Sequence, residues 1–383
     1  MTLYGQMINR AYWQSLIEKC WQERSVVWLY GVRRAGKTFL CRSLSEVAYF
    51  DCELPRTRRM LEDPEAFLAD HRDQRIVFDE IHRLQHPSEL LKIAADHFPS
   101  CRVLATGSST LAASSKFRDT LTGRKRNIWL TPMTLADMSD FGTTDLKRRL
   151  LHGGLPPFFL SEHLPERDFQ EWMDDYWSKD IQELFRLESR SSFQRFVELV
   201  LAQSGGMFEA SSFAGPCEVS RTTIANYLKV LEATMVANVV RPFSSHRPTE
   251  IVAAPRVYGF DTGFVCTHRD WQRLRDDDLG PLWEHFVLNE VQAASQGRNL
   301  LYWRDKRGHE VDFVLARRRQ VPVAIECKWK ADRFDPAGML AFRRQYPKGE
   351  NLVVAQDVDR AYSRRYGDLA VRFVGLRHLL DRL

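Results

Sequence analysis

The fold is decided by the stretch SVVWLYGVRRAGKT, residues 25–38. Residues 26–30 form a short apolar run, which suits a strand that is buried on both faces. Residues 31–38 then match the pattern G-x-x-x-x-G-K-[ST] at every fixed position. The two glycines let the backbone curl so that its N–H groups point at phosphate oxygens. The stretch therefore predicts a phosphate-binding loop (P-loop) between a strand and a helix, and with it a nucleotide site for ATP.

Each part of this loop has an expected role. Lys37 places a cation on the β- and γ-phosphates, where it acts in catalysis, and Thr38 offers a hydroxyl to Mg²⁺. A turn rich in glycine and arginine could match by chance, but an apolar strand precedes the motif and a helical stretch with Leu40 follows it. The residues expected to bind the nucleotide are Gly31, Arg33, Arg34, Ala35, Gly36, Lys37, Thr38, Phe39, Thr106 and Ser108.

A pair of acidic residues follows a second buried run. Residues 76–78 are apolar and precede Asp79 and Glu80 in RIVFDEIHRL, residues 75–84. Downstream of a P-loop this order predicts a Walker B strand, in which Asp79 holds Mg²⁺ through water and Glu80 orients and polarises the attacking water. The alternative is a solvated acidic turn after a core strand, and the P-loop favours the catalytic interpretation.

Further apolar runs predict the class of fold. Residues 103–105 and 127–130 form two more strands, and strands that alternate with helices indicate an α/β domain with a parallel sheet. The nucleotide then lies at the carboxyl ends of the strands. Thr106 and Ser108 are candidates for a sensor between Glu80 and the γ-phosphate, and a simple turn of small residues is the alternative.

Composition narrows the class of protein. The chain has 383 residues, enough for two or three domains, and its net charge of +5 is compatible with nucleic acid without requiring it. Its seven cysteines form no C-x-x-C pair, which favours a reducing compartment over a disulfide framework or a zinc ribbon. The N-terminus lacks an apolar signal core, and no run of about 18 apolar residues occurs, so a cytoplasmic protein without a membrane partner is expected.

Three segments resemble a known family. They are TGSST (residues 106–110), LTGRKRNIWLTPMTLADM (121–138) and GGLPPFF (153–159). In this order they resemble the prokaryotic AAA-type P-loop ATPases with a C-terminal domain of unknown function, and the resemblance covers essentially the whole chain. It implies a homo-oligomer and a catalytic arginine, Arg124 or its competitor Arg118, that neutralises charge on the transferred phosphoryl group. A plain surface arginine is the alternative at either position.

The middle of the chain, residues 141–245, is expected to be helical and winged-helix-like. Residues 211–242 have the pattern of helix, turn, helix and strand, and Ser220 can cap the second helix. Arg221, Thr222 and Thr223 in its first turn are placed like the exposed residues of a DNA-reading helix. DNA is therefore an expected partner, and the alternative is a lid that only packs against the ATPase domain.

A second chemical signal is GHEVDFVLARRRQVPVAIECKWK, residues 308–330, which predicts two antiparallel strands around a basic turn. Pairing across a five-residue loop sets even-numbered residues opposite even-numbered ones, so Asp312, Glu326 and Lys328 share one face. This arrangement is the core of a restriction-endonuclease-like site of the PD-(D/E)xK type, in which Asp312 and Glu326 bind Mg²⁺ and Lys328 orients water or holds the scissile phosphate. Glu284, or failing it Glu290, would supply a further metal ligand from the preceding helix.

Other interpretations of this segment stay open. The strands could be amphipathic with a solvated face, the nuclease-like fold could be catalytically silent, or the domain could serve as a docking surface. The arginines at 317–319 could grip a phosphate backbone or keep a turn in solution. His309 is expected to be a hydrogen-bonded neighbour of the carboxylates rather than a ligand.

Together these signals predict three parts: a P-loop ATPase domain (1–140), a winged-helix-like domain (141–245) and a restriction-endonuclease-like domain (246–383). The leading hypothesis is a DNA-associated ATPase whose turnover drives DNA remodelling or gates a Mg²⁺-dependent nuclease-like domain. The alternative is an ATP-driven regulatory or protein-remodelling switch with a silent, partner-binding C-terminal domain. A third hypothesis, an inactive nucleotide sensor, predicts ATP binding without turnover.

Overall fold

The computed structural model of the chain describes residues 2–3, 6–107, 121–182, 189–244, 254–297, 299–316 and 321–383. Contacts divide the chain into two compact units, whereas the sequence suggested three parts. The first unit comprises residues 1–145, 154–190 and 233–236, and the second comprises residues 146–153, 191–232 and 237–383. The chain therefore passes between the two units several times.

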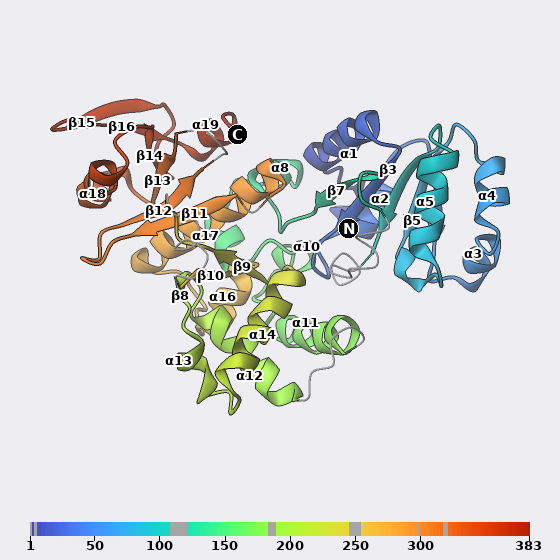
Figure 1. Ribbon diagram of the computed structural model, residues 1–383, viewed down its shortest axis with the longest axis horizontal. Coiled ribbons are helices and arrows are strands. Elements are labelled where there is room, and N and C mark those ends of the chain that lie inside the picture. The colour runs from blue at the N-terminus through green and yellow to red at the C-terminus, as the bar shows by residue number, and fades with distance from the viewer. Residues whose placement is uncertain are drawn as a thin grey trace. The chain divides into compact units, whose positions relative to one another are not determined.

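The first unit is built on a five-stranded sheet whose strands all run parallel, which confirms the predicted α/β fold. The strand order is β4-β5-β6-β3-β7 (Figure 1), so the strand that leads into the P-loop lies inside the sheet. Parallel strands end at one edge, and this edge collects the P-loop and the ends of β5 and β6. The bounds are β3 (Val26–Tyr30), β4 (Val47–Asp51), β5 (Arg75–Asp79), β6 (Arg102–Thr106) and β7 (Lys125–Trp129).

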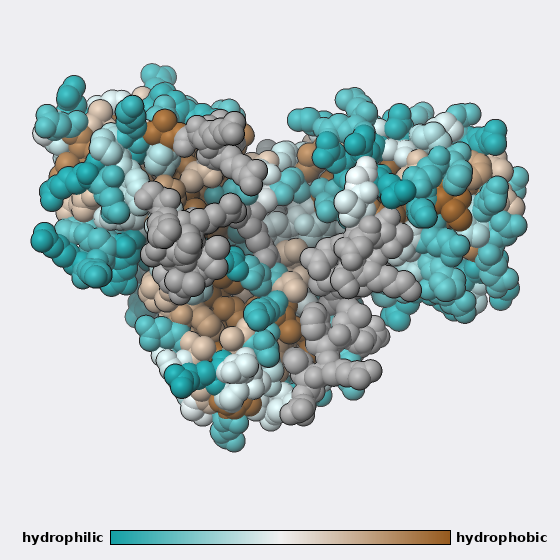
Figure 2. Space-filling model, in the orientation of Figure 1, coloured by the Kyte–Doolittle hydropathy of each residue, from teal (hydrophilic) through white to brown (hydrophobic). Residues whose placement is uncertain are grey.

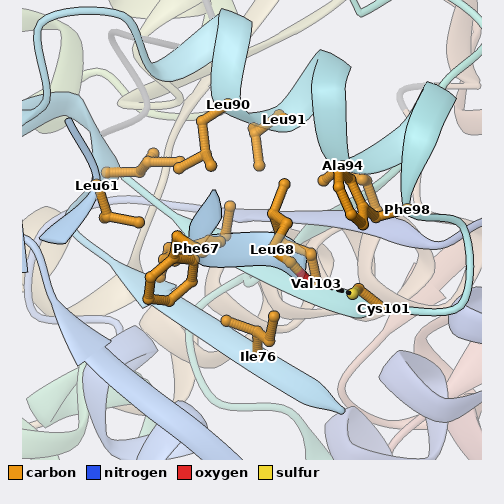
Figure 3. Close-up of a cluster of buried hydrophobic side chains, with 14 of the residues drawn as sticks. Leu61, Phe67, Leu68, Ile76, Leu90, Leu91, Ala94, Phe98, Cys101 and Val103 are labelled. Carbon is orange, nitrogen blue, oxygen red and sulfur yellow. Dashed lines mark hydrogen bonds between the residues drawn. The ribbon is translucent and has the colours of Figure 1, made fainter. Parts of the chain in front are cut away.

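Both faces of this sheet are covered. Figure 3 shows one face, where Phe67 of α4 and Leu91 of α5 lie with Ile76 of β5 in a buried apolar cluster. Val27 and Val77 point the other way, because side chains alternate along a strand, and they are also fully buried. The P-loop strand therefore has the two apolar environments that its unbroken run of hydrophobic residues requires.

Some helices of the first unit pack against the sheet, and others lie next to the P-loop. Helix α1 packs against β3 and β7, and α2 follows the P-loop directly. Helix α11 continues without a break into a π-helical stretch, Tyr176–Ile181. The bounds are α1 (Ala11–Glu23), α2 (Lys37–Arg42), α3 (Pro55–Met60), α4 (Pro64–Asp70), α5 (Pro87–His97), α8 (Leu135–Asp140), α10 (Pro156–Phe159) and α11 (Glu166–Asp175), with two short strands, β1 (Thr2–Leu3) and β2 (Gln6–Met7).

The second unit contains a mixed sheet of six strands in the order β11-β12-β13-β14-β16-β15 (Figure 1). Strands β12 and β13 are antiparallel and pair Val314 with Ala324, which confirms that even-numbered residues lie opposite each other. Helix α17 packs on β13, and α18 packs on β12. The bounds are β11 (Leu300–Arg304), β12 (Glu310–Leu315), β13 (Val323–Lys328), β14 (Asn351–Ala355), β15 (Tyr362–Tyr366), β16 (Leu369–Val374), α17 (Asp276–Ser295), α18 (Ala337–Gln345) and α19 (Leu376–Leu380).

A smaller antiparallel sheet, in the order β8-β10-β9, belongs to the same unit. Helices α13 and α14 and strand β9 follow each other as the predicted helix, turn, helix and strand. Strand β10, which the sequence placed at the start of the last part, instead pairs with β8 and β9. The bounds are α9 (Leu146–His152), α12 (Arg190–Ala202), β8 (Gly206–Met207), α13 (Ala210–Ala214), α14 (Arg221–Ala233), β9 (Ala237–Val240), β10 (Arg256–Gly259) and α16 (Thr262–His268).

The visible surface of the first unit is mainly hydrophilic, and hydrophobic residues occur there as small patches (Figure 2). Exposed large hydrophobic side chains in this unit include Phe39, Leu54 and Met60. All seven cysteines are free thiols, as their scattered spacing predicts. Within the described ranges, no helix is both long and apolar enough to cross a membrane.

Candidate functional site

The P-loop joins β3 to α2 through two residues with positive φ angles. Gly36, at 95°, adopts this region without strain, whereas a side chain such as that of Arg34, at 63°, is uncommon there. Gly31 leaves no room for a side chain, because a Cβ atom there would lie 2.3 Å from the carbonyl oxygen of Leu130. The loop borders a pocket of about 340 Å³, and Phe39 also lines it. The structure thus places the predicted nucleotide-binding loop around one cavity.

Lys37 is the buried cation of this pocket. Its side chain is 8% exposed, and its Nζ donates hydrogen bonds to the carbonyl oxygens of Gly31 at 2.9 Å and Val32 at 3.2 Å. Burial lowers the pKa of Lys37, and the charges of Glu80 and Asp180 oppose this effect. The ammonium has three donors, so one remains for a phosphate oxygen while the loop carbonyls hold the other two.

Asp79 ends β5 and is 2% exposed. Its carboxylate accepts hydrogen bonds from the hydroxyl of Tyr49 at 2.6 Å and from the hydroxyl of Thr106. These contacts orient the carboxylate, while each oxygen keeps a second lone pair for a water ligand. Mg²⁺ is usually bound through one or two protein groups, several waters and substrate phosphates, so Thr38 in the pocket and Asp79 behind it fit this ion.

Glu80 follows Asp79 in a left-handed conformation with a φ angle of 52°. Its backbone N–H donates to the Thr106 hydroxyl at 3.0 Å, and Nδ1 of His82 lies 3.1 Å from its Oε2. Burial raises the pKa of Glu80, but His82 and the charges of Lys37 and Arg33 bring the pKa below its ordinary value. The side chain lines the pocket, so it presents an ionised carboxylate where a water would be polarised.

Thr106 has a different contact from the one that was predicted for a sensor. The residue is fully buried, and its hydroxyl donates to Asp79 and accepts from the N–H of Glu80. It therefore orients the two acidic residues instead of facing the pocket directly. The other sensor candidate, Ser108, and the competing arginine, Arg118, lie outside the described residues, as do the three arginines at 317–319.

The sequence did not reveal that α11 and its π-helical continuation belong to this site. Nε of Arg33 lies 3.3 Å from Oδ2 of Asp180, and the Arg33 carbonyl accepts a hydrogen bond from the Trp172 indole at 3.0 Å. Arg34 lies 3.9 Å from a carboxylate oxygen of Glu171. Arg33 and Arg34, at two x positions of the loop motif, therefore both lie near acidic residues of α11 or its π-helical continuation. In the sequence, the acidic residues of this segment are the only indication of these contacts.

Asp180 places a carboxylate in a pocket predicted to bind an anion. It is 5% exposed and lies in the π-helical stretch, a conformation that is frequent at functional sites. Burial raises the pKa of Asp180, and the charges of Arg33 and Lys37 oppose this. A phosphate group would compete with this carboxylate for Arg33, because both are anions that accept from guanidinium.

A buried ion pair contacts the P-loop through a backbone carbonyl group. Arg10, which precedes α1, donates to both carboxylate oxygens of Asp137 at 2.7 and 2.9 Å and to the carbonyl oxygen of Ala35 at 2.9 Å. The Trp13 indole also donates to Asp137 at 3.1 Å. Burial raises the pKa of Asp137, but Arg10 brings it below its ordinary value. These residues are far apart in the chain, so no local pattern indicated their contact.

Arg124, the predicted catalytic arginine, lies away from the pocket of its own chain. It immediately precedes β7, whose first residue pairs with Val26 at the start of β3. The P-loop follows the other end of β3, so Arg124 sits at the opposite edge of the sheet. Its Nε donates to Asp96 at 2.8 Å, and both side chains are about one third exposed. Arg124 cannot reach the nucleotide of its own chain from this position.

The predicted carboxylates of the second unit meet at an irregularity in β12. Leu301 pairs with Val314 and Trp303 with Val311, so β12 contains one more residue than β11 here. Such a bulge redirects a side chain, and Asp312 lies within it. Bulges often accompany functional sites, so this irregularity marks the cluster as a specific arrangement.

The structure brings Asp312, Glu326 and Lys328 together, as their register predicted. Nζ of Lys328 lies 3.0 Å from Oε2 of Glu326 and 3.7 Å from Oδ2 of Asp312. The N–H of Cys327 also donates to Asp312 at 2.8 Å. Glu284 of α17 joins this group through Arg256, whose Nη1 lies 3.2 Å from Oε1 of Glu284. The helical acid of the cluster is therefore Glu284 rather than Glu290.

Burial and mutual charge set the protonation of this cluster. Burial and the charge of Asp312 raise the pKa of Glu284 to about 7, against the opposing effects of Arg256 and Tyr258. Burial also raises the pKa of Glu326 well above its ordinary value, and Asp312 adds to this. Asp312 has a lowered pKa, because the Lys328 charge and hydrogen bonds outweigh its burial.

The C-terminal cluster does not fit the predicted Mg²⁺ site in this arrangement. Across the described parts of the chain, no group of three or more His, Cys, Asp or Glu side chains is placed to hold a metal ion. Two cations, Arg256 and Lys328, instead contact the carboxylates. His309, the neighbouring imidazole, contacts Asp305 at 2.8 Å in the turn before β12.

The first turn of α14 is exposed at two of the three predicted positions, whereas Thr223 is half-buried and its hydroxyl forms a hydrogen bond with that of Ser220. The Ser220 hydroxyl accepts a hydrogen bond from the N–H of Thr223 at 3.1 Å, which caps the helix. Arg221 and Thr222 are exposed, while Ile224 is fully buried. The helix therefore presents two side chains that can donate hydrogen bonds at its N-terminus, where backbone N–H groups also favour an anion.

Family models match three consecutive stretches of the chain. Residues 23–139 match the AAA domain, residues 143–275 match a domain of unknown function (DUF8612), and residues 279–375 match another domain of unknown function (DUF4143). The P-loop, the parallel sheet and the first match define a P-loop domain in this part of the chain. More narrowly, this part of the chain is similar to the AAA-type domains of P-loop ATPases.

Similar proteins extend over most of the chain. Uncharacterized proteins of Mycobacterium tuberculosis and Mycobacterium bovis are each 29% identical over 304 residues, which cover 76% of this chain and 67% of each relative. A Walker-type ATPase of Pyrococcus abyssi has a TM-score of 0.43 and 15% identity, over 68% of this chain and 96% of that one. AMPPCP-bound DnaA from Aquifex aeolicus has a TM-score of 0.28 and 10% identity, over 58% and 88% of the two chains. Structural similarity at this level supports no statement about activity.

Proposed function

We propose that the first unit hydrolyses ATP, and that the arrangement of Lys37 and Glu80 around one pocket supports this activity best. The two side chains carry opposite charges and line the same cavity of about 340 Å³. A cation for the phosphates and an ionised carboxylate for water are the two protein groups that in-line hydrolysis needs most.

The residues divide the work of this reaction between binding and water activation. Lys37 and the N–H groups of the loop bind the β- and γ-phosphates, and Arg33 is available once it exchanges Asp180 for phosphate. Magnesium, held by Thr38 and through water by Asp79, would neutralise charge on the phosphate oxygens. Glu80 accepts a hydrogen bond from the attacking water. The Thr106 hydroxyl orients both acidic residues, because it accepts from the Glu80 N–H and donates to the Asp79 carboxylate.

Phosphate release in the presence of ATP and Mg²⁺ tests this proposal. Glu80→Gln should bind ATP with nearly unchanged affinity and lose turnover, because the amide is a poor acceptor for the water proton. Glu53→Gln is the matched control, since Glu53 lines the same pocket but is 56% exposed and pairs with Arg83. ATP binding to the parent chain without any turnover would instead support the nucleotide-sensor hypothesis.

We infer that Arg124 acts on the nucleotide of a neighbouring subunit. Because Arg124 lies next to the start of β7, it cannot act at the P-loop of its own chain. An AAA-type oligomer could place Arg124 beside the P-loop of another subunit. Mixtures of Arg124→Ala with Lys37→Ala should then regain turnover that neither variant shows alone, because the first supplies an intact P-loop site and the second an intact arginine. An unchanged rate in Arg124→Ala would leave Arg124 as a surface arginine paired with Asp96.

A second candidate function is DNA association through α14, which the exposed first turn favours. Arg221 and the capped helix N-terminus can contact phosphate, so binding should weaken steeply with salt. ATP turnover with single-stranded, duplex and four-way junction DNA tests whether binding is coupled to hydrolysis. Stimulation that Arg221→Ala abolishes supports a DNA-remodelling ATPase. Turnover that ignores all three DNAs supports a regulatory or protein-remodelling switch.

A further inference from the structure

Arg256 stands at the centre of the C-terminal carboxylate cluster. Its Nη1 lies 3.2 Å from Oε1 of Glu284 and 4.0 Å from Oδ1 of Asp312, so one nitrogen lies between the two acids. Its Nη2 lies 3.6 Å from Oε1 of Glu310. The Arg256 side chain is only 12% exposed, and it therefore occupies an interior position rather than a flexible surface one.

The basic and acidic side chains of the cluster alternate. Arg256 lies between Glu284 and Asp312, and Lys328 lies between Asp312 and Glu326. Each predicted ligand of a metal ion thus already contacts a protein cation. A divalent cation that bound Glu284 would have to displace the Arg256 guanidinium from that carboxylate, and one that bound Asp312 or Glu326 would compete with Lys328.

The strand that carries Arg256 explains why the arginine is held there. Residues two apart on a strand point to the same side, so Arg256 and Tyr258 of β10 both face α17. The hydroxyl of Tyr258 donates to the same oxygen of Glu284 that Arg256 contacts. Arg256 and Tyr258 of the segment RVYGFDTG therefore contact an acid on α17, and these contacts connect β10 to α17 and β12.

We propose that the guanidinium of Arg256 takes the place of a divalent cation, so that the C-terminal cluster is an internally neutralised structural network and not a nuclease centre. The network joins the small sheet β8-β10-β9 to the six-stranded sheet of the same unit. The proposal concerns the second unit alone and is independent of ATP hydrolysis in the first.

Removal of the guanidinium should expose a cation site. Mn²⁺ is the probe, titrated into the full chain without nucleotide and followed by its electron paramagnetic resonance signal. The parent chain should bind no Mn²⁺ that depends on Asp312, whereas Arg256→Met should gain one such ion per chain. The gain should disappear in Arg256→Met combined with Asp312→Asn. Arg304→Met is the matched control, because Arg304 approaches only Glu310, at 4.0 Å, and its removal should create no site.

Three results would overturn the proposal. The first is Mn²⁺ binding by the parent chain that Asp312→Asn abolishes, and the second is Mg²⁺-dependent DNA nicking by the parent chain that Asp312→Ala abolishes. The third is a folded Arg256→Met chain that gains no Mn²⁺ site. The first two tests use the parent chain and remain decisive even where Arg256→Met does not fold, and Arg256→Gln is a milder variant for the third.

Discussion

The P-loop site of the first unit and the carboxylate cluster of the second are both built from buried charged side chains, yet they differ in whether these charges remain available to a ligand. Around the P-loop, Lys37 contacts neutral carbonyl oxygens and Glu80 lines an open pocket. In the cluster, Arg256 and Lys328 already contact the acids. The first site keeps charges for a ligand, and the second satisfies its charges internally.

This difference shows why a set of catalytic residue types does not by itself define a catalytic site. A buried charge must find a partner, because an unpaired charge in the interior costs several kcal/mol or more. A ligand can supply that partner, and so can another residue of the chain. A site whose charges are paired by a ligand is a binding site, and one whose charges are paired by other residues is a structural network. The following predictions test which kind of partner each site uses.

The largest expected contrast is between Glu80 and Asp312. Glu80→Gln should lower kcat for ATP hydrolysis by about 10²–10⁴-fold, the usual contribution of a general base. Asp312→Asn, the same change at an acid of the other site, should leave kcat unchanged. Steady-state phosphate release measures both. A comparable loss of kcat in the two variants would show that the two sites act together, and it would contradict a purely structural role for the carboxylate cluster.

The ion pair behind the P-loop should carry a large share of the stability of the first unit. Asp137→Ala leaves the buried guanidinium of Arg10 without its carboxylate, and the loss of one partner of a buried pair costs about 3–5 kcal/mol. Thermal unfolding should show a clear fall in Tm, accompanied by weaker ATP binding, because Arg10 also holds the Ala35 carbonyl. Asp140→Ala, which removes a more exposed acceptor for the Ala11 N–H, is the control with the smaller expected effect.

The carboxylate cluster should make stability depend on pH. The pKa of Glu284 is about 7 in the folded chain against an ordinary value of 4.5, because burial and Asp312 disfavour its charge more than Arg256, Tyr258 and Lys328 favour it. Between these values the folded chain holds a proton that the unfolded chain releases. This stabilisation is complete below about pH 4.5 and is lost as the pH rises through about 7.

Glu284→Gln keeps the neutral form at every pH and should remove this dependence. The slope of unfolding free energy against pH should change by up to about 1.4 kcal/mol per pH unit in that window. Chemical unfolding of the parent chain and the variant at pH 5 and pH 7.5 measures the slope. Parallel curves would mean that Glu284 stays ionised in the folded chain.

The smallest expected effect concerns the acid inside the nucleotide pocket. Asp180→Asn removes a negative charge beside the phosphates and releases Arg33, so ATP should bind more tightly by about tenfold, which corresponds to a Coulomb change of about 1.4 kcal/mol in a partly solvated site. Fluorescent ATP titration measures the change, and Asp168→Asn, an exposed acid of α11, is the control. Weaker binding in Asp180→Asn would instead make this acid a positioning residue for Arg33.

The amino-acid sequence alone was enough to predict the P-loop, the acidic pair at the end of β5, the parallel sheet and the pairing of β12 with β13. These features depend on contiguous residues or on strand periodicity, which local sterics and hydrophobic burial impose wherever the chain folds. Only the tertiary structure decided the partners of the charges: Arg10 with Asp137, Arg33 with Asp180, and Arg256 with Glu284. Residues distant in the chain meet there because buried ions must be neutralised, and neutralisation depends on which segments the fold brings side by side.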